Sequence, residues 1–235
     1  MPEEEKSAIL SKNHSLRPVR TGRRKEPPLT TIFIHGLGQT PAAWNGVLRH
    51  LPLEDPQCAD LPALLKGQKA LYETLYRNFE ASCQAAAKDP ADLCGLSLGA
   101  VLALDYAIHN PGRVRSLALI APQYKMPKLL LKLQNSAFRR LPKSAFAQMG
   151  FSREDFLSLT GSMAALDFSQ QIPALACRAL ILVGEKDKTN RKAAQSLSGL
   201  LPQSEYAEIP HSGHEVNLEA PEPLATRLAQ FYSTI

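Results

Sequence analysis

The hydrophobic positions of this chain form short, nearly continuous apolar runs that alternate with longer segments of helical spacing. The runs cover 29–36, 91–95, 114–122, 177–185 and 204–210, and another short run ends near 58–62. Helical spacing occurs at 41–51, 66–88, 97–110, 191–201 and 222–235. Short apolar strands separated by amphipathic helices are typical of a parallel sheet covered on both faces. The pattern therefore predicts an α/β fold with a mostly parallel, twisted β-sheet and helices on both faces.

Two segments fall outside this alternation. Residues 1–28 form a basic N-terminal extension, with a helix expected over 2–12 and an edge strand over 16–20. Residues 124–160 are helix-like and interrupt the core between two strands, so we expect a short helical lid there. The core then comprises 29–123 and 161–235, and a chain of 235 residues is long enough for one domain. Because ligands bind beyond the carboxyl ends of parallel strands, a lid at that edge would cover the site.

Composition and charge narrow the function classes. The net charge of +5 is modest, and the chain carries no nucleic-acid-binding signature, so we expect no nucleic-acid partner. The four cysteines are widely spaced without a CxxC pair, which favours reduced thiols over disulfides or a metal site. No HExxH motif, no P-loop and no apolar run of membrane-spanning length is present. The sequence therefore predicts a cytoplasmic protein with no metal, no cofactor and no transmembrane segment.

One serine stands at the end of an apolar run. The residues Gly95-Leu96-Ser97-Leu98-Gly99 fit the pattern G-x-S-x-G between a predicted strand and a predicted helix. A serine at such a sharp turn projects its hydroxyl away from the sheet, and side chains at the flanking glycine positions would clash with the neighbouring strand and helix. A glycine-rich connection into a buried helix would give the same five residues, so the accompanying residues decide between the two interpretations.

A serine nucleophile needs a base and a carboxylate that orients the base. Asp187 follows the strand predicted at 177–185, and Glu185 competes with it in the same loop. His214 follows the strand predicted at 204–210, and His211 is a rival three residues earlier. Ser97, Asp187 and His214 occur in this order after three different predicted strands, which favours a catalytic triad.

Four segments of the chain resemble the α/β-hydrolase superfamily, and the resemblance covers about 29–235. They are the sequence from Phe33 to Gly38, the turn around Ser97, the loop 184–187, and Gly213-His214 followed by Glu219-Ala220-Pro221. The resemblance implies that Ser97 is the nucleophile, His214 the general base and then acid, and Asp187 the group that orients His214. It also implies an oxyanion hole at the backbone N–H groups of Leu37 and Leu98, where two donors would stabilise a developing negative charge.

This family resemblance leaves three functions open. The first is a carboxylesterase-like serine hydrolase that cleaves a carboxylic ester or thioester through an acyl-enzyme. The second is a menaquinone-pathway-type lyase or C–C bond hydrolase that uses the same triad on a carboxylated substrate. Such a substrate would favour an arginine close to Ser97, but Arg113 and Arg115 follow the helix predicted at 97–110 and are expected at the far end of the sheet. The third is a ligand-binding homologue with little turnover.

Several large side chains are candidates for the substrate pocket. Trp44, Phe138, Phe146 and Met149 can either line a pocket or pack in the core. The segment 124–150 contains six basic residues and no acidic one, with Lys128, Lys132 and Arg139 on one helical face. That face is either simply solvated or a contact for acyl chains, anionic substrates or a membrane surface. The oligomeric state stays open.

Overall fold

The computed structural model describes residues 29–86, 90–126, 138, 140 and 142–235. The helix expected over 2–12 and the strand expected over 16–20 lie outside these residues. Within them, six parallel strands form one sheet in the order β2-β1-β3-β4-β5-β6. Their bounds are β1 Thr30–Ile34, β2 Asp55–Ala59, β3 Ala91–Leu96, β4 Val114–Ile120, β5 Arg178–Gly184 and β6 Ser204–Ile209. The predicted α/β architecture is confirmed.

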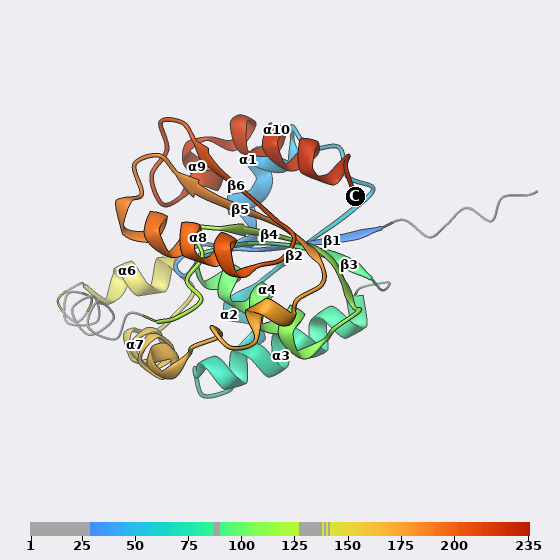
Figure 1. The fold of residues 1–235 in the computed structure, drawn as a ribbon. Coiled ribbons are helices and arrows are strands. Elements are labelled where there is room, and N and C mark those ends of the chain that lie inside the picture. The colour runs from blue at the N-terminus through green and yellow to red at the C-terminus, as the bar shows by residue number, and fades with distance from the viewer. Residues whose placement is uncertain (1–28, 87–89, 127–137, 139, 141) are drawn as a thin grey trace, which may run out of the picture.

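The apolar runs form strands because both faces of the sheet are buried. In β4, Leu117 and Leu119 pack on one face, whereas Ala118 and Ile120 pack on the other. The first face is covered by α3 Tyr72–Ala86, α4 Leu98–His109 and α8 Lys188–Leu200. The second is covered by η1 Pro41–Trp44, α1 Asn45–Leu48, α9 Val216–Glu219 and α10 Pro221–Tyr232. Figure 1 shows α1 and α10 on one side of the sheet and α3 and α4 on the other.

Two helices differ from their predicted bounds. The segment 41–51 divides into the 3₁₀ turn η1 and the short α1. The helix expected from residue 66 begins only at Tyr72. Gly67, which follows the short helix α2 Leu61–Leu64, has a φ of +76°, and this value lies outside helical geometry. Residues 65–71 are therefore a loop between α2 and α3.

The chain between β4 and β5 contains several short helices. They are α6 Lys143–Gln148, α7 Arg153–Ser162, η2 Met163–Ala165 and η3 Ile172–Ala174. Phe156 of α7 is their centre of packing, since its ring lies 4.8 Å from that of Phe138 and 5.3 Å from that of Phe146. Phe146 and Phe156 belong to the same hydrophobic core as α3, α4 and α8, and Phe138 packs against it, so the segment is continuous with that face of the sheet domain.

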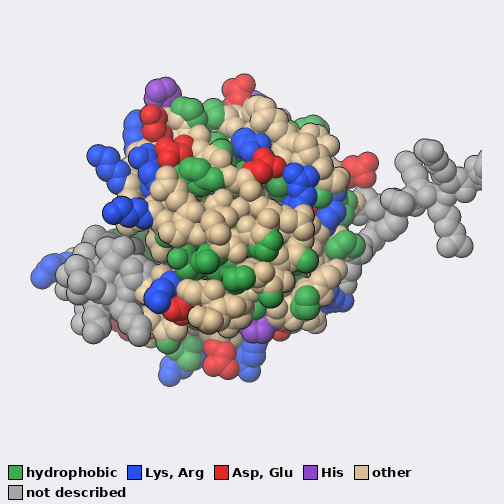
Figure 2. Space-filling model, in the orientation of Figure 1, with side chains coloured by type: hydrophobic (Ala, Val, Ile, Leu, Met, Phe, Trp, Pro, Cys, Tyr) green, Lys and Arg blue, Asp and Glu red, His purple; other side chains and the backbone are tan. Residues whose placement is uncertain are grey.

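The surface carries charges of both signs. On the face drawn in Figure 2, Lys and Arg side chains are interspersed with Asp and Glu, and hydrophobic side chains appear as separate small areas. No helix within the described residues is long and apolar enough to cross a bilayer. The basic face formed by Lys128, Lys132 and Arg139 lies outside those residues, so its contact with a membrane stays a prediction.

The strand order brings the loops that carry the motifs together. Strand β1 pairs with β2 on one side and β3 on the other, and Ile34 at its end lies opposite Gly95 of β3. The order of strands reverses at β1, and such a switch point at the carboxyl edge is where open α/β sheets bind ligands. The loop after β1 and the turn after β3 therefore meet at that edge.

Candidate active site

Ser97 occupies a strained turn between β3 and α4. Its φ of 54° and ψ of −111° lie in a region that residues with side chains seldom adopt. Its backbone N–H donates to Ile120 O at 2.9 Å, which fixes the turn to the end of β4. Ser97 is half-buried and lines a cavity, so the turn presents its hydroxyl to that cavity.

The two glycines of the motif are required by close approach. A Cβ on Gly95 would lie 2.2 Å from Gly99 O, and one on Gly99 would lie 2.1 Å from Ile34 O. Neither contact is sterically possible without a backbone shift. The G-x-S-x-G pattern is thus explained by packing of β1, β3 and α4 around the serine.

Asp187 and His214 form a hydrogen-bonded pair beside the same cavity. His214 Nδ1 lies 2.8 Å from Asp187 Oδ2, and both residues line the cavity together with Ser97. The Asp187 side chain is 4% exposed, whereas that of His214 is 44% exposed. The carboxylate is therefore fixed in the protein while the imidazole is open to a ligand. Within the described residues, the hydrogen bonds of the His214 ring are to Asp187 and Asn190, and none joins it directly to Ser97 Oγ.

The start of α8 orients the Asp187 carboxylate. Asp187 is the N-cap of this helix, and its Oδ1 accepts from the backbone N–H of Asn190 at 3.1 Å. Burial by itself would raise the pKa of Asp187, but hydrogen bonds from His214 and Asn190 outweigh burial and lower that pKa below its ordinary value. Asp187 is thus anionic near neutral pH, as a partner for an imidazolium must be.

The competing residues lie away from the cavity. Glu185 accepts a hydrogen bond from the backbone N–H of His211 at 2.7 Å, and the His211 side chain is 91% exposed. Their contact fixes the two loops to each other. Neither residue is among those described that line the cavity with Ser97.

The loop that follows β1 is held by buried polar side chains. His35 Nδ1 lies 2.8 Å from Gly36 O, and its Nε2 accepts from the backbone N–H of Leu61 at 3.3 Å. Burial lowers the pKa of His35, which matches a neutral ring that donates once and accepts once. His35 therefore connects this loop to α2, and Leu37 two residues later lines the cavity with Leu98.

A pair of buried amides joins the Leu37 loop to the His214 loop. Gln39 Nε2 donates to Asn217 Oδ1 at 3.2 Å, and Asn217 Nδ2 donates back to Gln39 Oε1 at 3.1 Å. Gln39 Oε1 also accepts from the backbone N–H of Gly36 at 3.3 Å. We call Gln39 and Asn217 the amide clamp. It joins the loop after β1 to α9, which follows His214.

The cavity has a volume of about 530 Å³ and a largely apolar wall. Seven of the fourteen described lining residues are apolar and come from α4, α7, η2 and the segments after β1 and β4: Leu37, Leu98, Val101, Met126, Phe138, Phe156 and Met163. The remaining described lining residues are Ser97, Gln123, Thr160, Asp187, Thr189, Asn190 and His214. This size and composition suit a small organic ligand with an apolar portion.

Of the four predicted pocket residues, Phe138 lines the cavity and three do not. Trp44 is fully buried on the opposite face of the sheet, 5.1 Å from the ring of Phe33, because η1 packs there with α1 and α10. Phe146 is fully buried and packs on Phe156 behind the cavity wall. Met149 lies against the loop at Gly38. The expectation that Trp44, Phe146 and Met149 line the pocket is corrected accordingly.

The predicted arginines lie at the other end of the sheet. Arg115 near the start of β4 donates to both carboxylate oxygens of Asp92 near the start of β3. Ser97 follows the opposite end of β3. No lysine or arginine is among the described residues that line the cavity.

The described residues contain no cluster of three or more His, Cys, Asp or Glu side chains that would hold a metal. All four cysteines are free thiols, and burial raises their pKa values, that of Cys83 to about 12. A thiol with a raised pKa is a weak nucleophile.

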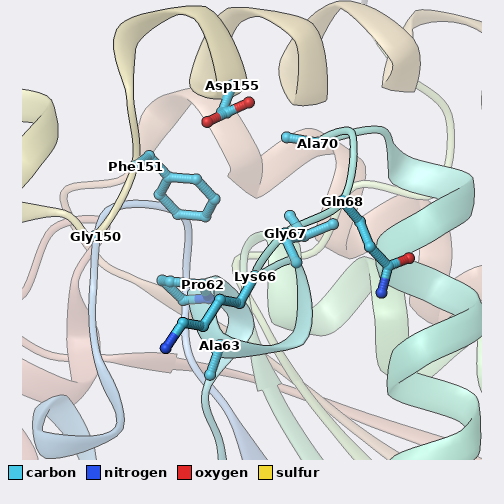
Figure 3. A pocket seen from close by; sticks show the side chains of 10 residues that line it. Pro62, Ala63, Lys66, Gly67, Gln68, Ala70, Gly150, Phe151 and Asp155 are labelled. Atoms are coloured by element: carbon cyan, nitrogen blue, oxygen red, sulfur yellow. The ribbon is translucent and has the colours of Figure 1, made fainter.

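A second cavity of about 340 Å³ lies between the loop after α2 and the first turn of α7. Figure 3 shows Lys66 and Gln68 on the loop side and Phe151 and Asp155 on the α7 side. None of Ser97, Asp187 and His214 lines it. This cavity is separate from the candidate active site.

Sequence reasoning missed most of the residues that shape the cavity. Val101 is one helical turn after Ser97, so its place on the side of α4 that lines the cavity could have been found from the motif. Gln123 and Asn190 come from segments that only the fold brings together, and no sequence signal pairs them. The same holds for the amide clamp.

The comparisons with known proteins agree with this architecture. The family model described as "Alpha/beta hydrolase family" matches residues 31–227. A search of curated proteins finds no match.

Similar solved structures include a thermophilic esterase from Thermogutta terrifontis, with a TM-score of 0.72 and 20% identity over 88% of this chain and 90% of that one. An enol-lactonase from Burkholderia xenovorans has a TM-score of 0.77 and 16% identity over 90% and 94% of the two chains. MenH from S. aureus has a TM-score of 0.73 and 16% identity over 90% and 96%. At these identities the likeness shows the fold, and the family model shows the membership: the chain belongs to the α/β-hydrolase family.

Proposed function

We propose that the protein is a serine hydrolase that cleaves a carboxylic ester or thioester through an acyl-enzyme. The observation that carries this proposal is that Ser97, on a strained turn, faces the same cavity as the hydrogen-bonded pair of Asp187 and His214. A serine hydroxyl is a weak nucleophile until a base accepts its proton, and this arrangement supplies both the base and the carboxylate that orients it.

The reaction follows from these positions. Ser97 Oγ attacks the carbonyl carbon while its proton passes to His214 Nε2, and the imidazolium is stabilised by Asp187 through Nδ1. His214 then gives the proton to the departing alkoxide or thiolate, which leaves an acyl group on Ser97. A water molecule deprotonated by His214 attacks this acyl-enzyme, and the proton returns to Ser97 as the acid leaves.

The developing oxyanion needs donors near Ser97. The backbone N–H groups of Leu37 and Leu98 are our candidates, because both residues line the cavity and Leu98 is the first residue of α4. The first N–H groups of a helix have no partner within the helix, and the helix N-terminus attracts negative charge. Removal of one such donor typically lowers kcat by about a hundredfold or more.

The cavity wall favours an ester with an uncharged, apolar acyl group. Its described lining contains seven apolar side chains and no lysine or arginine to bind a substrate carboxylate. The alternative of a lyase acting on a carboxylated substrate therefore has no cationic partner among the described residues. In this proposal the segment 124–160 acts as a lid, since Met126, Phe138, Phe156, Thr160 and Met163 reach the cavity from it or its edge.

The proposal is tested with p-nitrophenyl butyrate and a butyryl thioester. Wild type should release product, and intact mass should show a butyryl adduct that is absent in Ser97→Ala. Asn110→Leu is a matched control, because Asn110 lies at the far end of α4 and donates to Glu80 at 2.8 Å. Turnover that persists in Ser97→Ala, or a wild type inactive on both substrates, would contradict the proposal.

A further inference from the structure

Asn190 is a buried amide that contacts two members of the candidate triad. Its Nδ2 donates to Asp187 Oδ2 at 2.7 Å and to Oδ1 at 3.0 Å, and it lies 3.1 Å from His214 Nδ1. Only 8% of Asn190 is exposed, and the residue lines the cavity. The amide thus contacts the carboxylate at the same oxygen that faces His214.

Gln123 holds this amide from a different part of the chain. Gln123 Nε2 donates to Asn190 Oδ1 at 2.7 Å. Gln123 follows β4 after Ala121, which has a φ of 48°, and precedes the helical segment between β4 and β5. The bond fixes which end of the Asn190 amide faces Asp187, because the oxygen is engaged by Gln123 and the nitrogen must then point to the carboxylate.

We propose that Asn190, oriented by Gln123, is a positioning residue that acts through Asp187 to set the pH at which His214 becomes available as a base. The inference rests on the proposed function, because it assigns a role to a neighbour of the proposed triad. Asn190 does not exchange a proton with substrate in this proposal.

The physical reason is the direction of the amide dipole. An N–H that points at a carboxylate disperses its negative charge, so the carboxylate attracts the imidazolium less strongly. Without that donor, Asp187 would hold the protonated form of His214 to higher pH. The carboxylate itself keeps its place, since the backbone N–H of residue 190 still donates to Oδ1 and His214 still bonds to Oδ2.

Among the described residues, the charged groups on the elements around the pair are exposed, apart from the half-buried Arg191 of α8, and substitutions at Asn190 or Gln123 leave them unchanged. They lie on the loop before α8, in its first turn, on the segment from β6 to the end of α9 and on the chain between β4 and β5: Glu185, Lys186, Lys188, Arg191, His211, Glu215, Glu219, Lys125 and Asp167. Solvent screens exposed charges, so they contribute a common background to every variant.

The test measures phosphonylation of Ser97 by a fluorophosphonate as a function of pH, which requires no knowledge of the natural substrate. Asn190→Leu keeps the volume of the side chain and removes its donor. We expect the midpoint of the acid limb to rise by about one pH unit, since a hydrogen bond to a charged group is worth roughly tenfold in equilibrium. The rate should fall about tenfold below the midpoint and much less on the plateau.

Gln123→Leu should move the midpoint in the same direction by a smaller amount, and Asn110→Leu should leave it in place. A midpoint that is unmoved or lowered in Asn190→Leu overturns the inference, and so does an equal loss of rate at every pH, which would indicate a packing role alone. If Asn190→Leu does not fold, Gln123→Leu decides, because an unmoved midpoint there also overturns the inference. Failure of the fluorophosphonate to label wild type at Ser97 would instead count against the proposed function.

Discussion

The amide clamp of Gln39 and Asn217 provides a test of how the site is held together. Asn217 is 1% exposed and Gln39 is 6% exposed, so water cannot replace lost partners. Asn217→Leu removes both reciprocal bonds of the clamp and a weaker bond to Ala43 O at 3.4 Å. Gln39 keeps its bonds to Glu215 and Gly36, and so remains buried with part of its amide unpaired.

The magnitude follows from these bonds. Each of the two reciprocal bonds contributes about 1 kcal/mol, and an unpaired buried amide group costs about 1–3 kcal/mol. We therefore expect Asn217→Leu to lower the free energy of unfolding by about 2–3 kcal/mol. The double variant Gln39→Met, Asn217→Leu replaces both partners with apolar side chains, so it should lose about 2 kcal/mol less than the sum of the two single variants.

Urea unfolding of the four proteins, with a common m-value, measures this coupling directly. Ester turnover is measured in parallel, because the clamp joins the Leu37 loop to the His214 loop. We expect the double variant to regain stability while its kcat stays below that of wild type, since the apolar pair lacks the directional bonds that set the loop positions. Additive losses, within about 0.5 kcal/mol, would refute the reasoning.

Three further predictions follow from the cavity, the turn around Ser97 and Asp187. Because each buried methylene is worth about 0.8 kcal/mol, kcat/KM for p-nitrophenyl esters should rise about fourfold for each methylene added to the acyl chain, until the cavity is filled. If kcat/KM were highest for the acetate ester, the result would argue against an apolar acyl site. Gly99→Ala places a Cβ 2.1 Å from Ile34 O and should cost about 3 kcal/mol or more in chemical unfolding, whereas Gly161→Ala in α7, with no atom within 4 Å, should be neutral or stabilising. The pKa of Asp187 lies below its ordinary value of 3.8, so the contribution of this carboxylate to stability is present above pH 3.8 and is lost as the pH falls further. Asp187→Asn should therefore lessen the fall in the free energy of unfolding between pH 5 and pH 2. An unchanged dependence of that free energy on pH would contradict the lowered pKa of Asp187.

The strands were predictable because both faces of this sheet are buried. Every residue of β3 is buried, and β5 is buried from Ala179 to Gly184, so these strands are mostly apolar runs between polar turns, interrupted in β3 by Asp92. The start of α3 was less predictable. Residues 66–71 continue the helical spacing, and only the positive φ of Gly67 and the packing of the α2 loop move the start of the helix to Tyr72.

The candidate site was predictable where the backbone dictates the residue. Gly95 and Gly99 are fixed by contacts that exclude a Cβ, so the motif around Ser97 can be read from the sequence. The cavity wall is different, because Val101, Met126 and Phe156 have many apolar substitutes and come from separate elements. Trp44 shows the same limit, since a large aromatic residue near a motif can pack on either face of the sheet.

Asp187 shows how the sequence and the structure together distinguish between two candidate carboxylates. The sequence offers Asp187 and Glu185 in one loop, and the two are hard to separate on charge alone. Asp187 caps α8 through Oδ1 and faces His214 through Oδ2, so the start of the helix fixes the rotation of the carboxylate. Aspartate is favoured as an N-cap because its short side chain reaches the N–H three residues later, a geometry that the longer glutamate does not provide. The need for an N-cap at the start of α8 therefore also places the Asp187 carboxylate beside the imidazole of His214, and this follows from helix capping alone.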